Sequence, residues 1–143
     1  KSLPEAPVAP GSQELVHSKQ LRLQAYERLV ILAERIALPN LISRSNEPGL
    51  DKRSMQQLLT QTIRQEFDYN LSQQIYMSNE AWEMVKNARG TVVRIINNTY
   101  AQLPVTATGE ELARTLIEEF LEMDKDPCRV AIDFVKAEVA RVM

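Results

Sequence analysis

Apolar side chains recur at every third or fourth position through most of this chain, a spacing that is typical of amphipathic helices. The most regular run consists of Leu59, Ile63, Phe67, Leu71 and Ile75, at intervals of four residues. Only 4 of the 143 residues are glycine, which argues against an all-β fold rich in tight turns. The sequence therefore predicts an all-α protein, a single compact domain of about five helices in an irregular bundle.

A first helix is predicted from about Gln13 to Ala37. Its middle, Leu29–Ala33, is apolar on every side, so we expect this helix at the centre of the bundle. Pro39 is expected to end the helix, because proline cannot donate the backbone hydrogen bond that would continue it. We expect only a short turn at Asn40–Ile42 before the next loop.

Capping residues mark the beginnings of four further helices. These residues are Asp51, Ser78, Thr108 with Glu111, and Asp126 followed by Pro127. The helices are expected to reach about Ile75, Tyr100, Met123 and Val142, and the first of these four runs on to Ile75 or breaks at Asn70. Gly90, inside the third predicted helix, is expected to mark a close helix crossing. Leu121 and Val130 are assigned to inward faces of the last two helices.

Residues 1–12 are rich in proline and alanine and are predicted to form a tether, with the helical domain occupying residues 13–143. No run of about 18 apolar residues occurs, so this sequence is not expected to span a membrane. It begins at Lys1 rather than at an initiator methionine, and we expect that an upstream anchor or signal peptide was removed. Cys128 is the only cysteine, which excludes an intramolecular disulfide; a partly buried structural role is favoured over the modest reactivity of a helix N-terminus.

The formal net charge of −2 combines a slightly basic region, residues 1–105, with an acidic region, residues 106–143. Because neither has a dense cationic footprint, nucleic acid is not an expected partner. Arg22, Arg28 and Arg35 form a basic stripe in the first helix, but Glu27 and Glu34 alternate with them. We therefore expect ordinary surface ion pairs along this helix, with weak attraction to an anionic membrane as the alternative.

Residues that carry catalysis or bind metals are sparse. Glu118 and Glu122 share a helix face and are the candidate cation ligands, but no Glu-x-x-His motif accompanies them, so a solvated acidic face is expected. The sequence from Asp68 begins like a calcium-binding loop, but Gln73 and Asn79 stand where that loop needs glycine and glutamate, so we exclude a calcium site here. No phosphate-binding loop, zinc-protease motif or serine-hydrolase motif occurs. We predict no metal, no cofactor and no enzymatic activity.

Large side chains are concentrated in Arg64–Arg89, in a chain whose aromatic content is 6%. Tyr76 and Trp82 in this stretch are the candidate pocket or interaction residues, together with Gln73 and Gln74. Aromatic residues at helical spacing more often pack in a core, so a structural role is favoured for the two aromatics. The glutamine-rich face of the second predicted helix offers a surface for self-association, because uncharged polar groups lose water more readily than charged ones.

Three segments resemble a family of small uncharacterised bacterial proteins. They are LRLQAYERLVILAERI (Leu21–Ile36), NLSQQIYMSNEAWEMVKNAR (Asn70–Arg89) and DPCRVAIDFVKAEV (Asp126–Val139). The resemblance spans about Leu21–Met143, and it implies an all-helical soluble domain that follows a single N-terminal membrane helix and a short connecting segment. It implies no activity and no site residues.

The leading hypothesis is a non-enzymatic interaction or scaffold domain, the soluble part of a membrane-anchored bacterial protein. Its partner would be another protein or a second copy of itself, and its location the cytoplasmic side of a membrane, with the periplasm as the alternative. A hypothesis from a different class is a small-ligand or metal-binding helical protein. That protein would use the acidic fourth helix or a pocket near Trp82 as its site.

Overall fold

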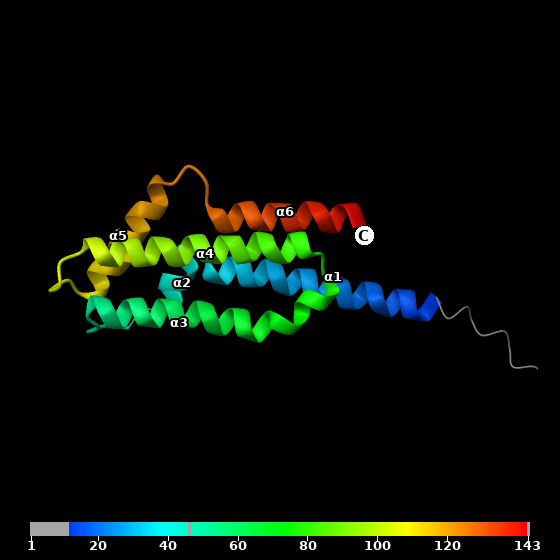
Figure 1. The fold of residues 1–143 in the computed structure, drawn as a ribbon, viewed down its shortest axis with the longest axis horizontal. Coiled ribbons are helices and arrows are strands. Elements are labelled where there is room, and N and C mark those ends of the chain that lie inside the picture. The colour runs from blue at the N-terminus through cyan, green and yellow to red at the C-terminus, as the bar shows by residue number, and fades with distance from the viewer. Residues whose placement is uncertain (1–11, 46, 143) are drawn as a thin grey trace, which may run out of the picture.

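A computed structural model describes the backbone of residues 12–45 and 47–142 and the side chains from residue 16 onward. These residues form six α-helices and one 3-10 helix and contain no strand, which confirms the all-α class (Figure 1). The elements are α1 (Ser12–Ile36), α2 (Leu38–Arg44), α3 (Lys52–Asn70), η1 (Leu71–Tyr76), α4 (Asn79–Gln102), α5 (Gly109–Glu122) and α6 (Pro127–Val142). Residues 1–11 of the predicted tether lie outside the described residues.

Helix α1 contacts most of the other elements, as expected of a central helix, but its apolar middle is not covered on every side, because Ile31 is 55% exposed. The helix packs against α2, α3, η1, α4 and α6. Figure 1 shows α3 and α6 on opposite sides of it and α5 crossing one end of the bundle, where α5 contacts α2, α3 and α4. The first turns of α1 project beyond the neighbouring helices, and the side chains of residues 16–20 are exposed.

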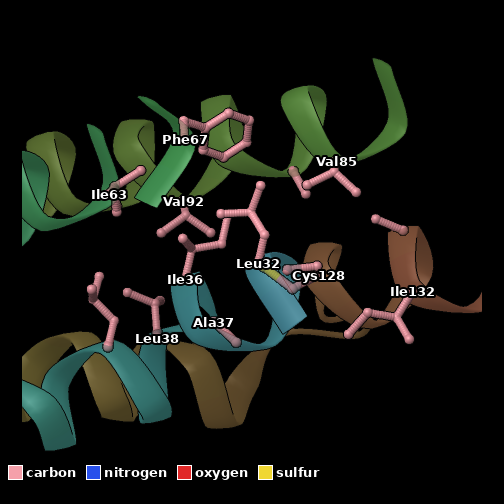
Figure 2. Packing of buried hydrophobic residues seen from close by; sticks show 14 of the residues in the cluster. Leu32, Ile36, Ala37, Leu38, Ile63, Phe67, Val85, Val92, Cys128 and Ile132 are labelled. Atoms are coloured by element: carbon pink, nitrogen blue, oxygen red, sulfur yellow. The ribbon is translucent and has the colours of Figure 1, made fainter. Parts of the chain in front are cut away.

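The core forms around the inner face of α1. Leu32 and Ile36 are fully buried and point towards Phe67 of α3 and Val85 of α4, with Ile132 of α6 closing the other side (Figure 2). Burial of each such side chain stabilises the fold by about 1.5–3 kcal/mol relative to its exposure in water. Three other helices, α3, α4 and α6, therefore depend on the apolar residues of α1 for part of their contact surface.

The predicted N-caps are confirmed by their hydrogen bonds. In each, a side-chain oxygen accepts from a nearby backbone N–H: Asp51 from Ser54 at 2.7 Å, Ser78 from Ala81 at 3.0 Å, Thr108 from Glu111 at 3.0 Å, and Asp126 from Cys128 at 2.9 Å. The bond from Ser54 lowers the pKa of Asp51, because it stabilises the ionised carboxylate. These caps fix where α3, α4, α5 and α6 begin.

The short turn predicted at Asn40–Ile42 is wrong, because these residues belong to α2. Pro39 lies in the first turn of α2, where a missing backbone N–H costs nothing. Ala37 is extended, with φ −60° and ψ 137°, and separates the two helices. The proline therefore ends α1 and also begins a new helix, which raises the α-helix count to six instead of about five.

The second predicted helix breaks at Asn70, which confirms one of the two alternatives for its end, so Leu71 and Ile75 do not continue the buried face of α3. Leu71 is 50% exposed and Ile75 is 76% exposed, because the chain tightens into η1 after Asn70. A 3-10 helix has three residues per turn, so the four-residue repeat no longer stays on one face. Leu121 and Val130, also predicted inward, are exposed as well.

Two glycines in helices differ in what surrounds them. A Cβ added to Gly90 would meet nothing within 4 Å, so the predicted close helix crossing at Gly90 is wrong. Close approach occurs instead at Gly109, where a Cβ would lie 3.0 Å from the carbonyl oxygen of Leu50 and 3.0 Å from Cβ of Met55. The backbone N–H of Gly109 donates to that same oxygen at 2.7 Å and joins α5 to the start of α3.

Lys52 is a buried cation beside this joint, with 8% of its side chain surface exposed. Its Nζ donates to the carbonyl oxygens of Tyr100 at 2.7 Å and Leu103 at 2.8 Å, and lies 4.2 Å from the ring centroid of Tyr100. Carbonyls at a helix C-terminus lack intrahelical partners, so this cation satisfies them. Lys52 therefore has a structural role at the end of α4.

Candidate functional site

A hollow of about 600 Å³ opens between α1, α2 and α3. Its charged residues are Arg28 and Arg35 from α1, Arg44 from α2 and Glu66 from α3. We call it the arginine pocket. The rest of its wall consists of Ile31, Leu32, Thr62, Gln65, Tyr69 and Asn70, so Glu66 is the one acidic residue in this lining.

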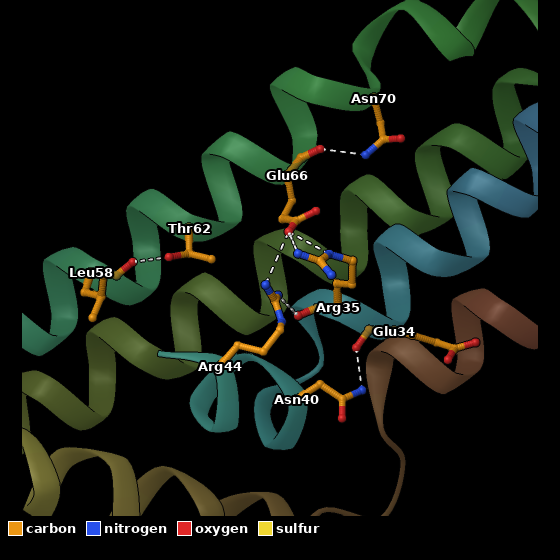
Figure 3. Close-up of polar contacts among 8 residues, drawn as sticks. All are labelled: Glu34, Arg35, Asn40, Arg44, Leu58, Thr62, Glu66 and Asn70. Atoms are coloured by element: carbon orange, nitrogen blue, oxygen red, sulfur yellow. Dashed lines mark hydrogen bonds and ion pairs between the residues drawn. The ribbon is translucent and has the colours of Figure 1, made fainter. Parts of the chain in front are cut away.

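Two of the arginines converge on the same carboxylate oxygen (Figure 3). Oε1 of Glu66 accepts from Nε of Arg35 at 2.7 Å and from Nη1 of Arg44 at 3.4 Å, and it lies 2.6 Å from Nη2 of Arg35 in an ion pair. Nη2 of Arg44 also donates to the backbone carbonyl of Arg35 at 2.7 Å. The hydrogen bond with Glu66 raises the pKa of Arg35 above its ordinary value, which keeps the guanidinium charged.

The third arginine is held without a carboxylate. Arg28 donates from Nε to Oδ1 of Asn70 at 3.1 Å and from Nη2 to the carbonyl of Tyr69 at 3.1 Å. Its guanidinium carbon lies 5.1 Å from the ring centroid of Tyr69. Asn70 is itself held by a bond from Nδ2 to the carbonyl of Glu66 at 2.8 Å. The position of Arg28 is therefore set by neutral groups that leave its charge uncompensated.

The lining of the arginine pocket carries three guanidinium groups and one carboxylate. Two positive charges are formally left over. Arginine presents N–H donors in a planar fork that matches the oxygens of carboxylate and phosphate groups. The pocket is therefore chemically suited to an anion.

A second hollow, of about 390 Å³, lies between α1 and α6, and we call it the apolar groove. Its lining residues are Leu23, Tyr26, Glu27, Val30, Ile31, Lys136 and Val139. Leu23 is 41% exposed and Ile31 is 55% exposed, although both belong to the central helix. Ile31 also lines the arginine pocket, so the two hollows meet on the outer face of α1.

A buried polar cluster joins α1, α4 and α6 around Glu138, which is 4% exposed. Oε2 of Glu138 accepts from the hydroxyls of Tyr26 and Ser78, each at 2.6 Å. The Tyr26 hydroxyl in turn accepts from the backbone N–H of Ser78 at 3.2 Å, and Nη2 of Arg141 lies 3.7 Å from Oε1 of Glu138. Hydrogen-bond donors from α1 and α4 already satisfy the carboxylate of Glu138, so we assign this cluster a structural role.

The four candidate residues from the sequence lie in different surroundings. Trp82 is 8% exposed and packs edge-on against Phe67, with ring centroids 5.7 Å apart. Tyr76 lines a hollow of about 310 Å³ beside the Glu138 cluster, and Trp82 is not part of that lining. Gln73 and Gln74 lie on η1, partly exposed and exposed respectively. The structure therefore does not bring these four residues into one site.

Metal and thiol chemistry find little support in the described part of the chain. Within residues 12–45 and 47–142, no group of three or more His, Cys, Asp or Glu side chains is arranged to hold a metal ion. Glu118 and Glu122 are exposed on α5. Cys128 is fully buried, and burial, with a smaller contribution from the charge of Asp126, raises the pKa of its thiol to about 12, which favours a structural role over reactivity.

Sequence reasoning identified the basic stripe on the first helix but missed the pocket that it helps to build. The expected pairing of its arginines with Glu27 and Glu34 is wrong for Arg28 and Arg35, which contact residues of α3 instead. The available signal was the spacing of Arg28 and Arg35, seven residues apart on one helix face. No pattern in the sequence indicated that Arg44 or Glu66 would line the pocket.

A model of a family of unknown function, DUF7935, matches residues 9–142. The chain belongs to this family. No curated protein and no solved structure matches it. In the described part of this DUF7935 domain, no helix is long and apolar enough to cross a membrane. The match covers the helices that build the arginine pocket, the apolar groove and the Glu138 cluster.

Proposed function

We propose that this DUF7935 domain is a non-enzymatic interaction module that binds an amphipathic helix of a partner protein in the apolar groove. The observation that carries the proposal is the exposure of Ile31, 55% at the middle of the central helix. A single exposed apolar residue is common on protein surfaces, but Ile31 lies in a groove whose lining also includes the apolar residues Val30 and Val139. Leu23 is exposed on the same side, so the groove presents two apolar contact points.

The dimensions of the groove suit a helix. It lies between α1 and α6, which pack against each other. Leu23 and Ile31 are eight residues apart, which corresponds to about 12 Å along a helix axis, or roughly two turns of a partner helix. Recognition of this kind uses apolar residues at positions i, i+3 or i+4, and i+7 of the bound helix.

The charges at the groove define the partner further. Glu27 of α1 and Lys136 of α6 both line it. A matching helix would carry a basic residue opposite Glu27 and an acidic residue opposite Lys136, on either side of its apolar stripe. Such pairs contribute more to orientation and specificity than to affinity.

Site-specific photo-crosslinking in cells that make the full-length protein tests this proposal. A photoreactive residue is placed at Leu23 or Ile31 in the groove, and at the exposed Asn87 of α4 as the control. We expect a discrete crosslinked partner from the groove positions only, and a crosslinked peptide with apolar residues at helical spacing. An Ile31→Asp change should reduce crosslinking from position 23 at least tenfold while the thermal unfolding midpoint stays nearly unchanged.

Three results would overturn the proposal. The first is equal crosslinking from Asn87 and from the groove, which would show that the groove has no special role. The second is a crosslinked segment without an apolar stripe. The third is a crosslink to a second copy of this chain, which would replace the partner helix with self-association.

We also propose that the domain acts beside a bacterial membrane, on its cytoplasmic side. The support is the resemblance of Leu21–Ile36 and Asn70–Arg89 to proteins with an N-terminal membrane helix. Fractionation of cells that express the complete gene tests the location, and protease added to spheroplasts tests the side. Recovery in the soluble fraction, or digestion from the periplasm, would contradict this part.

A further inference from the structure

We propose that the arginine pocket binds a phosphate group that carries two negative charges. This binding site adjoins the apolar groove at Ile31, but its charged residues do not line the groove, and the proposal does not depend on the function proposed for the groove. The phosphate would belong either to a small soluble molecule or to a lipid headgroup. In both cases the groups that recognise it are the guanidiniums of Arg28, Arg35 and Arg44.

The charge of the pocket favours a dianion. Three guanidiniums face one carboxylate, that of Glu66, so two positive charges are left in the lining. A phosphate monoester carries about −1.5 to −2 at pH 7 and compensates them with a single group. Ile31 and Leu32 form an apolar part of the same wall, which strengthens the attraction by keeping water away from one side.

The geometry favours a tetrahedral anion over a planar one. Arg28 and Arg35 come from α1 and Arg44 from α2, and the side chains of Arg35 and Arg44 approach Glu66 from different directions (Figure 3). A carboxylate presents its two oxygens in one plane, whereas a phosphate presents three oxygens that point apart. Two arginines already share one oxygen of Glu66, and the hollow of about 600 Å³ leaves room beside it.

The arginines are also held in position before any ligand arrives. Arg28 is fixed by Asn70 and by the carbonyl of Tyr69, and Arg44 by the carbonyl of Arg35. Each guanidinium has five N–H donors, so these bonds leave further donors for a ligand. Because the side chains are already ordered, binding an anion costs less conformational entropy than it would at freely moving arginines.

Glu66 has two opposite effects in this proposal. Its oxygen orients Arg35 and Arg44, and its negative charge opposes the incoming anion. Glu66→Gln keeps an oxygen that accepts hydrogen bonds and removes the charge. We therefore expect Glu66→Gln to raise the affinity for phosphate about fivefold, whereas Arg28→Gln and Arg35→Gln lower it at least tenfold.

The first experiment is a titration of the isotopically labelled protein with inorganic phosphate at constant ionic strength, followed by NMR. We expect saturable shifts in the side-chain Nε–H signals of Arg28 and Arg35 and in backbone signals of α1, α2 and α3. Arg114→Gln on α5 removes one positive charge from an exposed position outside the pocket and is the matched control. Arg35→Lys keeps the charge but loses the planar fork, and should weaken binding while the fold is retained.

The second experiment distinguishes the two sources of the phosphate. Sedimentation with vesicles that contain phosphatidic acid is compared with sedimentation with phosphatidylcholine vesicles, for the unaltered protein and for Arg35→Gln. Binding of inorganic phosphate without vesicle binding supports a soluble ligand. Vesicle binding that Arg35→Gln abolishes and Arg114→Gln preserves supports a lipid headgroup.

The proposal would be overturned by phosphate shifts that do not saturate, or that are the same in Arg35→Gln and in the unaltered protein. An equal loss of affinity in Arg114→Gln would also overturn it, because general charge attraction would then explain the binding. A decrease of affinity in Glu66→Gln would contradict the role assigned to its charge. All variants are first compared by thermal unfolding, so that a misfolded protein is not scored as a binding defect.

Discussion

Two glutamates join α1 to a neighbouring helix, and their surroundings differ in the kind of donor. Glu138 of α6 is 4% exposed and accepts from two neutral hydroxyls, those of Tyr26 and Ser78, with the single guanidinium of Arg141 3.7 Å from its other oxygen. Glu66 of α3 has a side chain that is 14% exposed and faces an excess of guanidiniums. Donors and acceptor are matched around Glu138, which stabilises the fold, whereas the cations outnumber the acid around Glu66. Surplus charge therefore distinguishes a candidate binding site from a structural contact.

Glu138→Ala should produce the largest loss of stability. The hydroxyls of Tyr26 and Ser78 would lose their acceptor inside the protein, and a cavity would remain, so we expect a decrease of about 3 kcal/mol in the free energy of unfolding. Urea denaturation measures it. Glu138→Gln keeps an acceptor oxygen and should lose less. A loss below about 1 kcal/mol for Glu138→Ala would contradict the structural role of the cluster.

High pH should lower the stability of the fold through Cys128, which lies on α6, the helix that also carries Glu138. Burial raises the pKa of this thiol from 9.0 to about 12. Below pH 9 the thiol is protonated in both folded and unfolded chains and has no effect on stability. Between pH 9 and pH 12 the unfolded chain loses the proton while the folded chain keeps it, so the unfolding free energy falls as pH rises.

At pH 10.5 this contribution should amount to a loss of about 2 kcal/mol relative to pH 8. Denaturation curves of the unaltered protein and Cys128→Ala, measured at both pH values, isolate the contribution of the thiol from that of tyrosines and lysines. The same pH-dependent loss in the two proteins would mean that Cys128 is accessible or ionised in the folded state.

Tyr26→Phe tests the neutral donors of the Glu138 cluster. The change removes the hydroxyl that donates to Glu138 at 2.6 Å and accepts from the backbone of Ser78 at 3.2 Å, while the ring stays in the core. We expect a loss of about 1–2 kcal/mol in urea denaturation. Tyr76→Phe makes the same chemical change at a partly exposed position and should cost less than about 0.5 kcal/mol. Equal effects would remove the distinction between the two tyrosines.

Glu66→Ala should lower stability less than Glu138→Ala or Tyr26→Phe, because its arginine partners are exposed to water. The side chains of Arg35 and Arg44 are 45% and 31% exposed, and ion pairs of this kind contribute about 1 kcal/mol or less. Urea denaturation of Glu66→Ala beside Glu138→Ala gives the direct comparison. If the two variants lost similar stability, both glutamates would have to be regarded as structural.

The helix beginnings were predictable because their determinants are local. Each N-cap bond joins residues two or three positions apart, as in Asp51 with Ser54. The same local reasoning was wrong where one residue type has two uses. Pro39 ends one helix and begins another, and only the first of these roles was predicted. The four-residue repeat through Leu71 could not decide between a helix that runs on to Ile75 and one that breaks at Asn70, where the backbone changes its period.

The arginine pocket was beyond sequence reasoning because its contacts join distant residues. Glu66 lies 31 residues from Arg35 and 22 from Arg44 along the chain. Whether these side chains meet depends on the angle between α1 and α3 and on the fold-back of α2, neither of which follows from helical periodicity. Trp82 is the opposite case, because it was a candidate site residue by its residue type but is a core residue in the structure, buried beside Phe67.

The central position of α1 has a consequence for how the protein is made. Tyr26 and its acceptor Glu138 are separated by 112 residues. At ribosomal rates of about 5–20 residues per second, roughly 6–22 s pass after Tyr26 is incorporated before Glu138 follows it. During that interval the side of α1 that α6 will cover has no partner within the chain, so the newborn protein presents this apolar side of α1 to chaperones before it presents any finished fold.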